Sequence, residues 1–213
     1  MVRPQALPPA LEAVRALLDD NAGRVLVGLT GPPAAGKSTL AAALAAALVN
    51  RDGVRAVAVP MDGFHLANAE LARLGLADRK GAPETFDAHG FVHLLGRLRA
   101  AGPEVVYAPA FDRVVNESIG SAIPVPPDIR VVVIEGNYLL LDTPPWDRVR
   151  DILDATLYLD APSDQRHDAL VRRQQARGLS RTAAQDWAGG SDAANARIIE
   201  ATRPRADKVL TRR

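Results

Sequence analysis

Residues 24–39 read RVLVGLTGPPAAGKST, an apolar run that passes through a glycine- and proline-containing turn into an alanine-rich segment. The run 24–30 is short and mostly apolar, which is typical of a strand buried on both faces of a sheet. The segment 39–50 is almost entirely alanine and leucine, which are good helix formers. Residues 31–39 match G-x-x-x-x-G-K-[S/T], a pattern that requires a strand before it and a helix after it. The stretch therefore predicts a phosphate-binding loop, or P-loop.

Each residue type in this loop has a chemical reason to be there. Gly31 and Gly36 allow backbone N–H groups to converge on phosphate oxygens at the positive end of the following helix. Lys37 can reach the β- and γ-phosphates as a point charge, and the Ser38 hydroxyl can bind Mg²⁺. The sequence therefore predicts that a nucleoside triphosphate is bound by Gly31, Pro32, Pro33, Ala34, Ala35, Gly36, Lys37, Ser38 and Thr39.

Strand-like and helix-like segments alternate along the rest of the chain. Further strands are predicted at 54–60, 105–108, 129–134, 155–159 and 208–210, and further helices at 70–76, 88–101, 163–177 and 191–202. Apolar residues at helical spacing predict one more helix within residues 1–23. Alternating strands and helices indicate βαβ units and a mainly parallel sheet in an α/β fold. The stretch 111–128 is predicted as a long loop, and loops of that length are often functional.

The composition limits the class of protein. The 213 residues suit a single domain over 1–213. Lysine and arginine total 26 against 25 aspartates and glutamates, a balance that disfavours a nucleic-acid or anionic-membrane partner. The absence of cysteine excludes disulfides and thiolate chemistry. No apolar run approaches the roughly 20 residues that cross a bilayer. We expect a cytoplasmic protein, and a homodimer is left open.

Two sequence features narrow the P-loop class. A Ras-like GTPase reads guanine with Asn-Lys-x-Asp, and none of the three lysines here follows an asparagine. A motor ATPase commonly ends its second acidic strand in Asp-Glu, whereas the apolar run 131–134 ends in Glu135-Gly136. One carboxylate is enough for Mg²⁺ but leaves no second acid to activate water. The pattern favours phosphoryl transfer to a substrate hydroxyl, with Glu135 and Ser38 as metal ligands.

A hydroxyl acceptor needs a carboxylate beside it to orient it or to take its proton. Asp62, in the sequence MDGFH (61–65), follows the predicted strand 54–60 and so falls at the same sheet edge as Gly31. We predict Asp62 as this carboxylate; a turn or helix-capping aspartate is the alternative. Gly63 would allow a tight backbone turn. A substrate contact and a purely structural role are equally consistent with His65.

These motifs resemble the uridine kinase, phosphoribulokinase and bacterial pantothenate kinase group of P-loop kinases. The matching stretches are GPPAAGKST (31–39), MDGFH (61–65), RKGAPETFD (79–87), YAPAFDR (107–113), VIEGNYLLLD (133–142), DQRHDALVRR (164–173) and ADKVL (206–210). The stretch 79–87 is most similar to pantothenate kinases. The full set is most similar to bacterial proteins described as fructose transport system kinases, or fructokinase-like.

The resemblance implies a P-loop NTPase three-layer fold with a five-stranded sheet, helices on both faces and an arginine-bearing lid at 164–190. It implies ATP and Mg²⁺ as cofactors and a small-molecule alcohol as substrate. The catalytic residues that it implies are Asp62, Lys37 and Arg172, with Arg173 on ATP. The substrate contacts that it implies are Asp62, His65, Arg79, Lys80, Arg113, Tyr138 and Arg166. For each lid arginine, a solvated helix face is the structural alternative.

The acceptor stays open at this point. A sugar such as fructose is the leading expectation, and pantothenate or a nucleoside is the alternative within the same class. Uridine kinases commonly place Gly-Ser where this chain has Ala34-Ala35, and aromatic residues are only 4% of the sequence, leaving few platforms to stack a pyrimidine. A nucleotide-dependent switch or assembly factor is the alternative from another class. The motifs at 61–65 and 79–87 argue against it.

Overall fold

The sheet at the centre of the molecule has five parallel strands in the order β2–β5–β1–β6–β7. The structure is a computed structural model that describes residues 5–176 and 178–211. The strands are β1 (Val25–Thr30), β2 (Ala56–Pro60), β5 (Val131–Glu135), β6 (Ala155–Asp160) and β7 (Lys208–Thr211). The expected α/β P-loop fold with a five-stranded parallel sheet is therefore confirmed.

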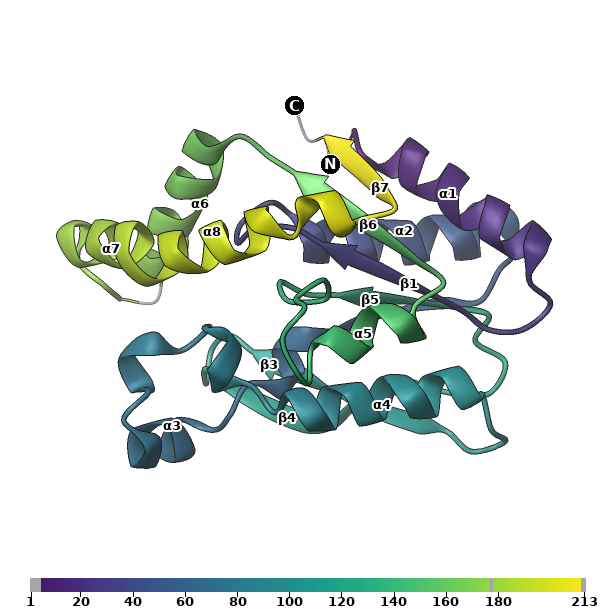
Figure 1. Cartoon of the computed structure of the whole chain (residues 1–213), viewed down its shortest axis with the longest axis horizontal. Helices are drawn as coiled ribbons and strands as arrows, with labels where there is room; N and C mark the ends of the chain where they lie inside the picture. Colours follow the sequence, from purple (N-terminus) through teal and green to yellow (C-terminus); the bar gives the residue numbers. More distant parts are fainter. Residues whose placement is uncertain (1–4, 177, 212–213) are drawn as a thin grey trace.

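Helices cover both faces of this sheet (Figure 1). The helices α1 (Leu7–Asp20) and α2 (Lys37–Asp52) pack on one face, where Val25, Val27 and Leu29 of β1 point. The helices α4 (Ala88–Ala100) and α5 (Asp147–Ile152) pack on the other face, where Leu26 points. Because β1 contributes side chains to both cores, every one of its residues is buried.

The register of the strands brings the functional segments to one edge of the sheet. Glu135, the last residue of β5, pairs with Leu29 of β1 and with Pro60 of β2. The P-loop follows β1, and the short 3-10 helix η1 (Met61–Phe64) follows β2. Ligands of such sheets bind outside the carboxyl ends of the strands. The P-loop, Glu135 and η1 therefore share that edge.

Three helices extend beyond the same edge. They are α6 (Ser163–Ala176), α7 (Arg181–Trp187) and α8 (Ala193–Ala201), with a π-helical turn, Ala188–Asp192, before α8. Figure 1 shows them at the left, above α3 (Asn68–Leu74). The predicted helix 163–177 forms up to Ala176, and residue 177 lies outside the described residues. The helix α7 was not predicted, because its sequence RTAAQDW shows no apolar periodicity that stands out.

The prediction of a loop over 111–128 is wrong. The strand β3 (Val106–Asp112) pairs antiparallel with β4 (Glu117–Val125), and the two form a separate sheet. Most residues of β4 are exposed, so they show no apolar alternation. Pro124 also argues against a strand in the sequence, because proline cannot donate a hydrogen bond to a neighbouring strand. The hairpin packs on η1 so closely that a Cβ on Gly63 would lie 2.4 Å from the Pro109 carbonyl oxygen. Gly63 thus permits a close approach, and its φ is not positive.

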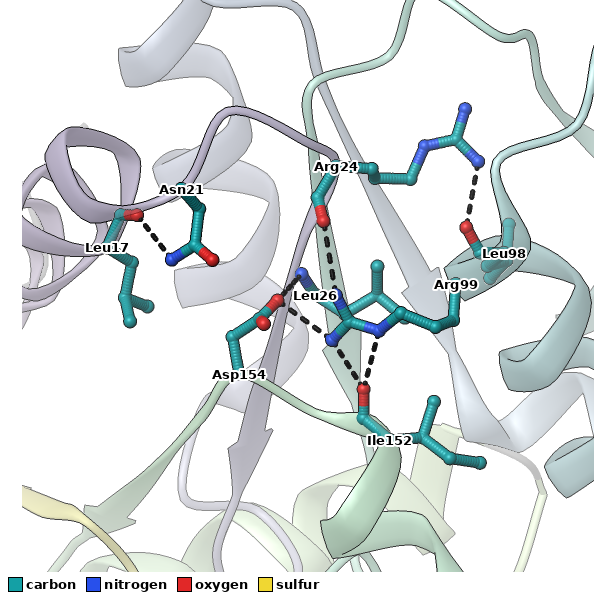
Figure 2. A network of polar contacts seen from close by, with 8 residues as sticks. All are labelled: Leu17, Asn21, Arg24, Leu26, Leu98, Arg99, Ile152 and Asp154. Atoms are coloured by element: carbon teal, nitrogen blue, oxygen red, sulfur yellow. Dashed lines mark hydrogen bonds and ion pairs between the residues drawn. The ribbon is translucent and has the colours of Figure 1, made fainter.

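The opposite edge of the sheet is held by charged side chains (Figure 2). Arg99 of α4 donates to the Ile152 carbonyl at 2.5 and 3.1 Å and to the Arg24 carbonyl at 3.2 Å. Its guanidinium also lies 2.9 Å from Asp154, which accepts a 2.7 Å bond from the Leu26 amide. These bonds tie α4 to the start of β1 and to the segment before β6. Within residues 5–176 and 178–211, no helix is long and apolar enough to span a bilayer.

Candidate active site

The P-loop is curled by residues with positive φ. Gly31, Ala34 and Gly36 have φ values of +143°, +60° and +100°. A Cβ on Gly31 would lie only 2.4 Å from the Leu159 carbonyl oxygen, so the position requires glycine. Ala34 holds a left-handed conformation that costs an L-residue roughly 1–2 kcal/mol. Left-handed residues within such a turn curve successive N–H groups into an anion-binding nest.

Lys37 is buried beneath this nest. Its Nζ donates to the carbonyl oxygens of Gly31 at 2.8 Å and Pro32 at 3.0 Å, which fold the side chain back over the loop. Burial lowers the pKa of the ammonium to about 8, and the carboxylates of Glu135 and Asp62 oppose that shift. A phosphate placed in the loop would favour the charged form, because an adjacent opposite charge raises the pKa of a lysine.

Ser38 and Glu135 form the part of the site that can hold a metal. The Ser38 hydroxyl donates to Oε1 of Glu135 at 2.9 Å. Burial raises the pKa of the Glu135 carboxyl, and the nearby Asp62 acts in the same direction. A cation would relieve both effects. Mg²⁺ prefers oxygen ligands and usually takes only one or two carboxylates, with water and phosphate completing its shell. The donor set therefore fits Mg²⁺ bound with a nucleotide.

Asp62 lies across a cavity from the P-loop. The cavity measures about 210 Å³, and its lining includes Asp62, Pro33 of the P-loop and Arg173 of α6. The Asp62 side chain is 25% exposed, and its Oδ2 lies 3.9 Å from a guanidinium nitrogen of Arg113 in the hairpin turn. Arg113 and Arg173 both line a second, adjoining cavity. Asp62, the P-loop and Arg173 thus line one cavity, and Arg113 lines the cavity that adjoins it.

His65 and Lys80 also line this cavity. Nδ1 of His65 lies 2.7 Å from the Asp62 carbonyl oxygen, and the imidazole packs against Phe86 and Phe111. The Lys80 ammonium donates to Asn116 and to the side chain of Asn68, at 2.7 and 2.6 Å, and lies 5.2 Å from the centroid of the Phe111 ring. Lys80 thus links the 79–87 segment to α3 and to the hairpin turn.

The lining of the cavity contains a group of carboxamide side chains that the sequence alone does not bring together. They are Asn68, Asn116, Asn137, Gln174 and Asn195. They come from α3, the hairpin turn, the segment after β5, α6 and α8, so no spacing in the sequence connects them. Each carboxamide can donate and accept hydrogen bonds. The cavity wall therefore combines hydrogen-bonding carboxamides with the charged side chains of Asp62, Lys80 and Arg173.

Two predicted arginines lie away from the cavity. Arg79 is exposed and forms a 2.5 Å ion pair with Glu84. Arg172 of α6 is exposed and is not among the residues that line the cavity, whereas its neighbour Arg173 is. Successive helical residues are about 100° apart, so only one of the two can face the sheet edge. The structure therefore favours Arg173 over Arg172 for contact with a phosphoryl group.

Tyr138 and Arg166 are held inside the protein. The Tyr138 hydroxyl is protonated, since burial raises its pKa, and it donates to the Gly81 carbonyl at 2.6 Å. Tyr138 is fully buried, and its bond to Gly81 holds the 79–87 segment in place. Arg166 is also buried and bonds to the Ala161 carbonyl at 3.1 Å and to Glu200 at 2.5 Å. Neither side chain lines the cavity that Asp62 shares with the P-loop.

The fold and this site define the class of the protein as a P-loop kinase, an ATP-dependent phosphotransferase that acts on an alcohol group. More specifically, the chain belongs to the Phosphoribulokinase / Uridine kinase family, whose sequence model matches residues 26–212. This membership confirms the resemblance seen in the sequence. ATP use follows from it, and Mg²⁺ is generally required by such enzymes.

The names of individual relatives mention different small molecules. A provisionally named fructose transport system kinase from Silicibacter sp. TM1040 has a solved structure with a TM-score of 0.82 and 45% identity, covering 94% of this chain and 98% of that one. A provisionally named uridine kinase of Schizosaccharomyces pombe is 38% identical over 75% of this chain and 70% of its own length. A pantothenate kinase of Clavibacter michiganensis is 34% identical over 64% of this chain, which spans only 43% of that protein.

Proposed function

We propose that this protein transfers the γ-phosphoryl group of ATP to a hydroxyl group of a sugar such as fructose. The observation that carries the proposal is the cavity between Pro33 and Asp62, with its wall of carboxamide side chains. Carboxamides can pair with the several hydroxyls of a sugar, each of which both donates and accepts. The name of the Silicibacter relative supports the same acceptor.

ATP would bind with its phosphates in the loop 31–39. The Lys37 ammonium, held 2.8 Å from the Gly31 carbonyl, is placed to pair with the β- and γ-phosphates. Ser38 and Glu135 would hold Mg²⁺, which when bound neutralises charge on those phosphates. Arg173 would add positive charge from the side of α6.

Asp62 would orient the acceptor hydroxyl and take its proton. As the acceptor oxygen bonds to the γ-phosphorus, the bond from that phosphorus to the β–γ bridging oxygen breaks and ADP leaves. The segment 164–190 would act as a lid that excludes water, which limits hydrolysis of ATP. Asn195 of α8 and Gly81 both line the cavity, so its wall includes the 79–87 segment and the helix that follows the lid.

Pantothenate is the alternative acceptor that a specific observation favours. Lys80 and Arg173 line the cavity, and two cationic side chains suit a carboxylate. The match to pantothenate kinases points the same way. A nucleoside such as uridine is the other alternative within the class, since Phe86, Phe111 and Trp187 line the cavity and an aromatic ring can stack on a base.

A coupled ADP-release assay would test the proposal. Sugars, pantothenate, uridine and ribulose 5-phosphate would each be added to protein with ATP and Mg²⁺, and phosphorylated products identified by mass spectrometry. Turnover highest with fructose or another sugar is the expected result. Turnover highest with pantothenate or uridine would refute the sugar acceptor and leave the kinase class intact. Turnover that no acceptor stimulates, together with nucleotide-dependent binding to another protein, would favour a switch.

A further inference from the structure

The hydrogen on the His65 ring is fixed by its partner. Nδ1 lies 2.7 Å from the carbonyl oxygen of Asp62, three residues earlier. A carbonyl oxygen can only accept, so Nδ1 must carry the hydrogen and donate it. In a neutral imidazole the other nitrogen, Nε2, is then an acceptor.

The ring cannot turn to exchange the two nitrogens. It is packed between Phe86 and Phe111, with ring centroids 4.0 and 4.7 Å away. The backbone of His65 is held as well, since its carbonyl accepts a 2.9 Å bond from the Ser118 hydroxyl and its amide donates to the Asp62 carbonyl. Both the position of the ring and its orientation are therefore set before any ligand binds.

The surroundings keep the ring neutral. Burial is the largest influence and lowers the pKa of His65. Asp62 of η1 opposes this shift, whereas the cations Lys80, from the segment after α3, and Arg173, from α6, reinforce it. The other ring neighbours, Phe86 and Phe111, are uncharged.

Nε2 of His65 is the ring nitrogen left to meet a ligand. It makes no hydrogen bond to the described part of the chain, and it is not among the buried side-chain atoms that lack one. It is therefore accessible, and the cavity that His65 lines is the same one that Asp62 lines. Two residues that line this cavity therefore carry hydrogen-bond acceptors, Asp62 with its carboxylate and His65 with the Nε2 lone pair.

We propose that Nε2 of His65 accepts a hydrogen bond from a second hydroxyl of the acceptor, beside the hydroxyl that Asp62 orients. The site thereby selects molecules with at least two hydroxyls over molecules with one. This inference rests on the proposed function, because Asp62 must be the residue that receives the reacting hydroxyl. His65 becomes a residue that determines specificity.

Two substitutions separate this role from a structural one. His65→Gln places a carbonyl oxygen near the position of Nε2, whereas His65→Asn keeps a donor near Nδ1 and leaves the Nε2 position empty. If Nε2 binds substrate, His65→Asn lowers kcat/KM for the best acceptor roughly tenfold to hundredfold, and His65→Gln retains most of it. If His65 only donates a hydrogen bond to the Asp62 carbonyl, His65→Asn retains a higher kcat/KM than His65→Gln, and the proposal is overturned.

Acceptor analogues provide the matching measurement. Fructose, or whichever acceptor gives the highest kcat/KM, is compared with monodeoxy analogues that each lack one hydroxyl other than the one phosphorylated. For one analogue, the kcat/KM of the wild type should be roughly tenfold to hundredfold lower than for the parent acceptor. His65→Asn should have equal kcat/KM values for that analogue and its parent. Equal use of every analogue by wild type would overturn the proposal.

Nitrogen-15 NMR of the imidazole rings separates failure of this inference from failure of the proposed function. Comparison with His65→Gln assigns the signal, and the expected spectrum near neutral pH shows hydrogen on Nδ1 only. Hydrogen on Nε2 would overturn the inference and leave the kinase activity untouched. Absence of turnover with every acceptor, in a protein that binds ATP, would overturn both.

Discussion

Asp62→Asn tests the chemical step most directly. Asparagine has almost the same shape as aspartate, so η1 and the packing of Gly63 against Pro109 should be undisturbed. The substitution removes the negative charge and the ability to take a proton. Asp62 is only 25% exposed, and its ion-pair partner Arg113 is 3.9 Å away on a half-exposed side chain. The loss of this ion pair should have little effect on stability.

The expected loss can be estimated from the role of the residue. Proton transfer to a positioned base contributes roughly 10²–10⁴-fold to a rate, which corresponds to about 3–5 kcal/mol of activation free energy. We therefore expect kcat to fall by about two to four orders of magnitude. The affinity for ATP should change little, because Asp62 follows β2 and the phosphates bind in the loop after β1.

The assay is steady-state ADP release at saturating ATP and Mg²⁺, combined with ATP binding measured by calorimetry. Asp78→Asn is the matched control, since Asp78 is an exposed aspartate on a nearby 3-10 helix and does not line the cavity. An Asp62→Asn variant with kcat within threefold of wild type would refute the assignment of Asp62. A parallel loss of ATP affinity would show that the substitution acts on the P-loop instead.

Four further changes probe other parts of the molecule. Glu135→Gln should raise the Mg²⁺ concentration for half-maximal activity at least tenfold, which a Mg²⁺ titration of activity measures. It should not destabilise the unliganded protein, because burial already disfavours the charged carboxyl, and a urea titration measures this. Arg173→Gln should lower kcat far more than Arg172→Gln, since only Arg173 lines the cavity, and steady-state kinetics compare them. Gly63→Ala should lower the free energy of unfolding by about 1–3 kcal/mol, because its Cβ meets a backbone oxygen; urea unfolding measures this. Arg99→Met should lower the free energy of unfolding by about 1–3 kcal/mol, also measured by urea unfolding. The affinity for ATP should not change, because the network in Figure 2 is at the edge of the sheet opposite the P-loop.

Each of these expectations has a contrary result. Unchanged Mg²⁺ dependence in Glu135→Gln would remove that carboxylate from the metal site. A larger effect from Arg172 than from Arg173 would mean that α6 rotates when ligands bind. Wild-type stability in Gly63→Ala would show that the hairpin can move away from η1 at no cost. A weaker affinity for ATP in Arg99→Met would mean that the two edges of the sheet are energetically coupled.

The parallel sheet and the nucleotide-binding half of the site could be predicted because their signals are local. Gly31 to Thr39 is a contiguous motif between a strand and a helix, and Glu135 ends an apolar run. In a parallel sheet the carboxyl ends of all strands meet at one edge. Motifs that follow different strands, such as Asp62, are therefore brought to the same edge without further information.

The hairpin and the partners of the arginines could not be predicted in this way. The strand β4 is mostly exposed, so burial imposes no alternation on its sequence. Arg79, Arg166 and Tyr138 sit in motifs shared with the family, yet each is satisfied by a neighbour within the protein. Whether a side chain faces a cavity or an ion-pair partner depends on helix rotation and packing, which residue type does not specify.

The sequence by itself determined the fold class, the loop motif at 31–39 and the position of Asp62 and Glu135 at one edge of the sheet, because hydrophobic burial and a contiguous loop are encoded by neighbouring residues. Only the tertiary structure decided which side chains line the cavity beside Asp62. The carboxamide wall draws on five separate segments, and the hydrogen on His65 is fixed by a contact with the Asp62 carbonyl and by rings from two other segments. Such features exist only where distant segments meet, and the chain reaches that arrangement through packing of the whole core.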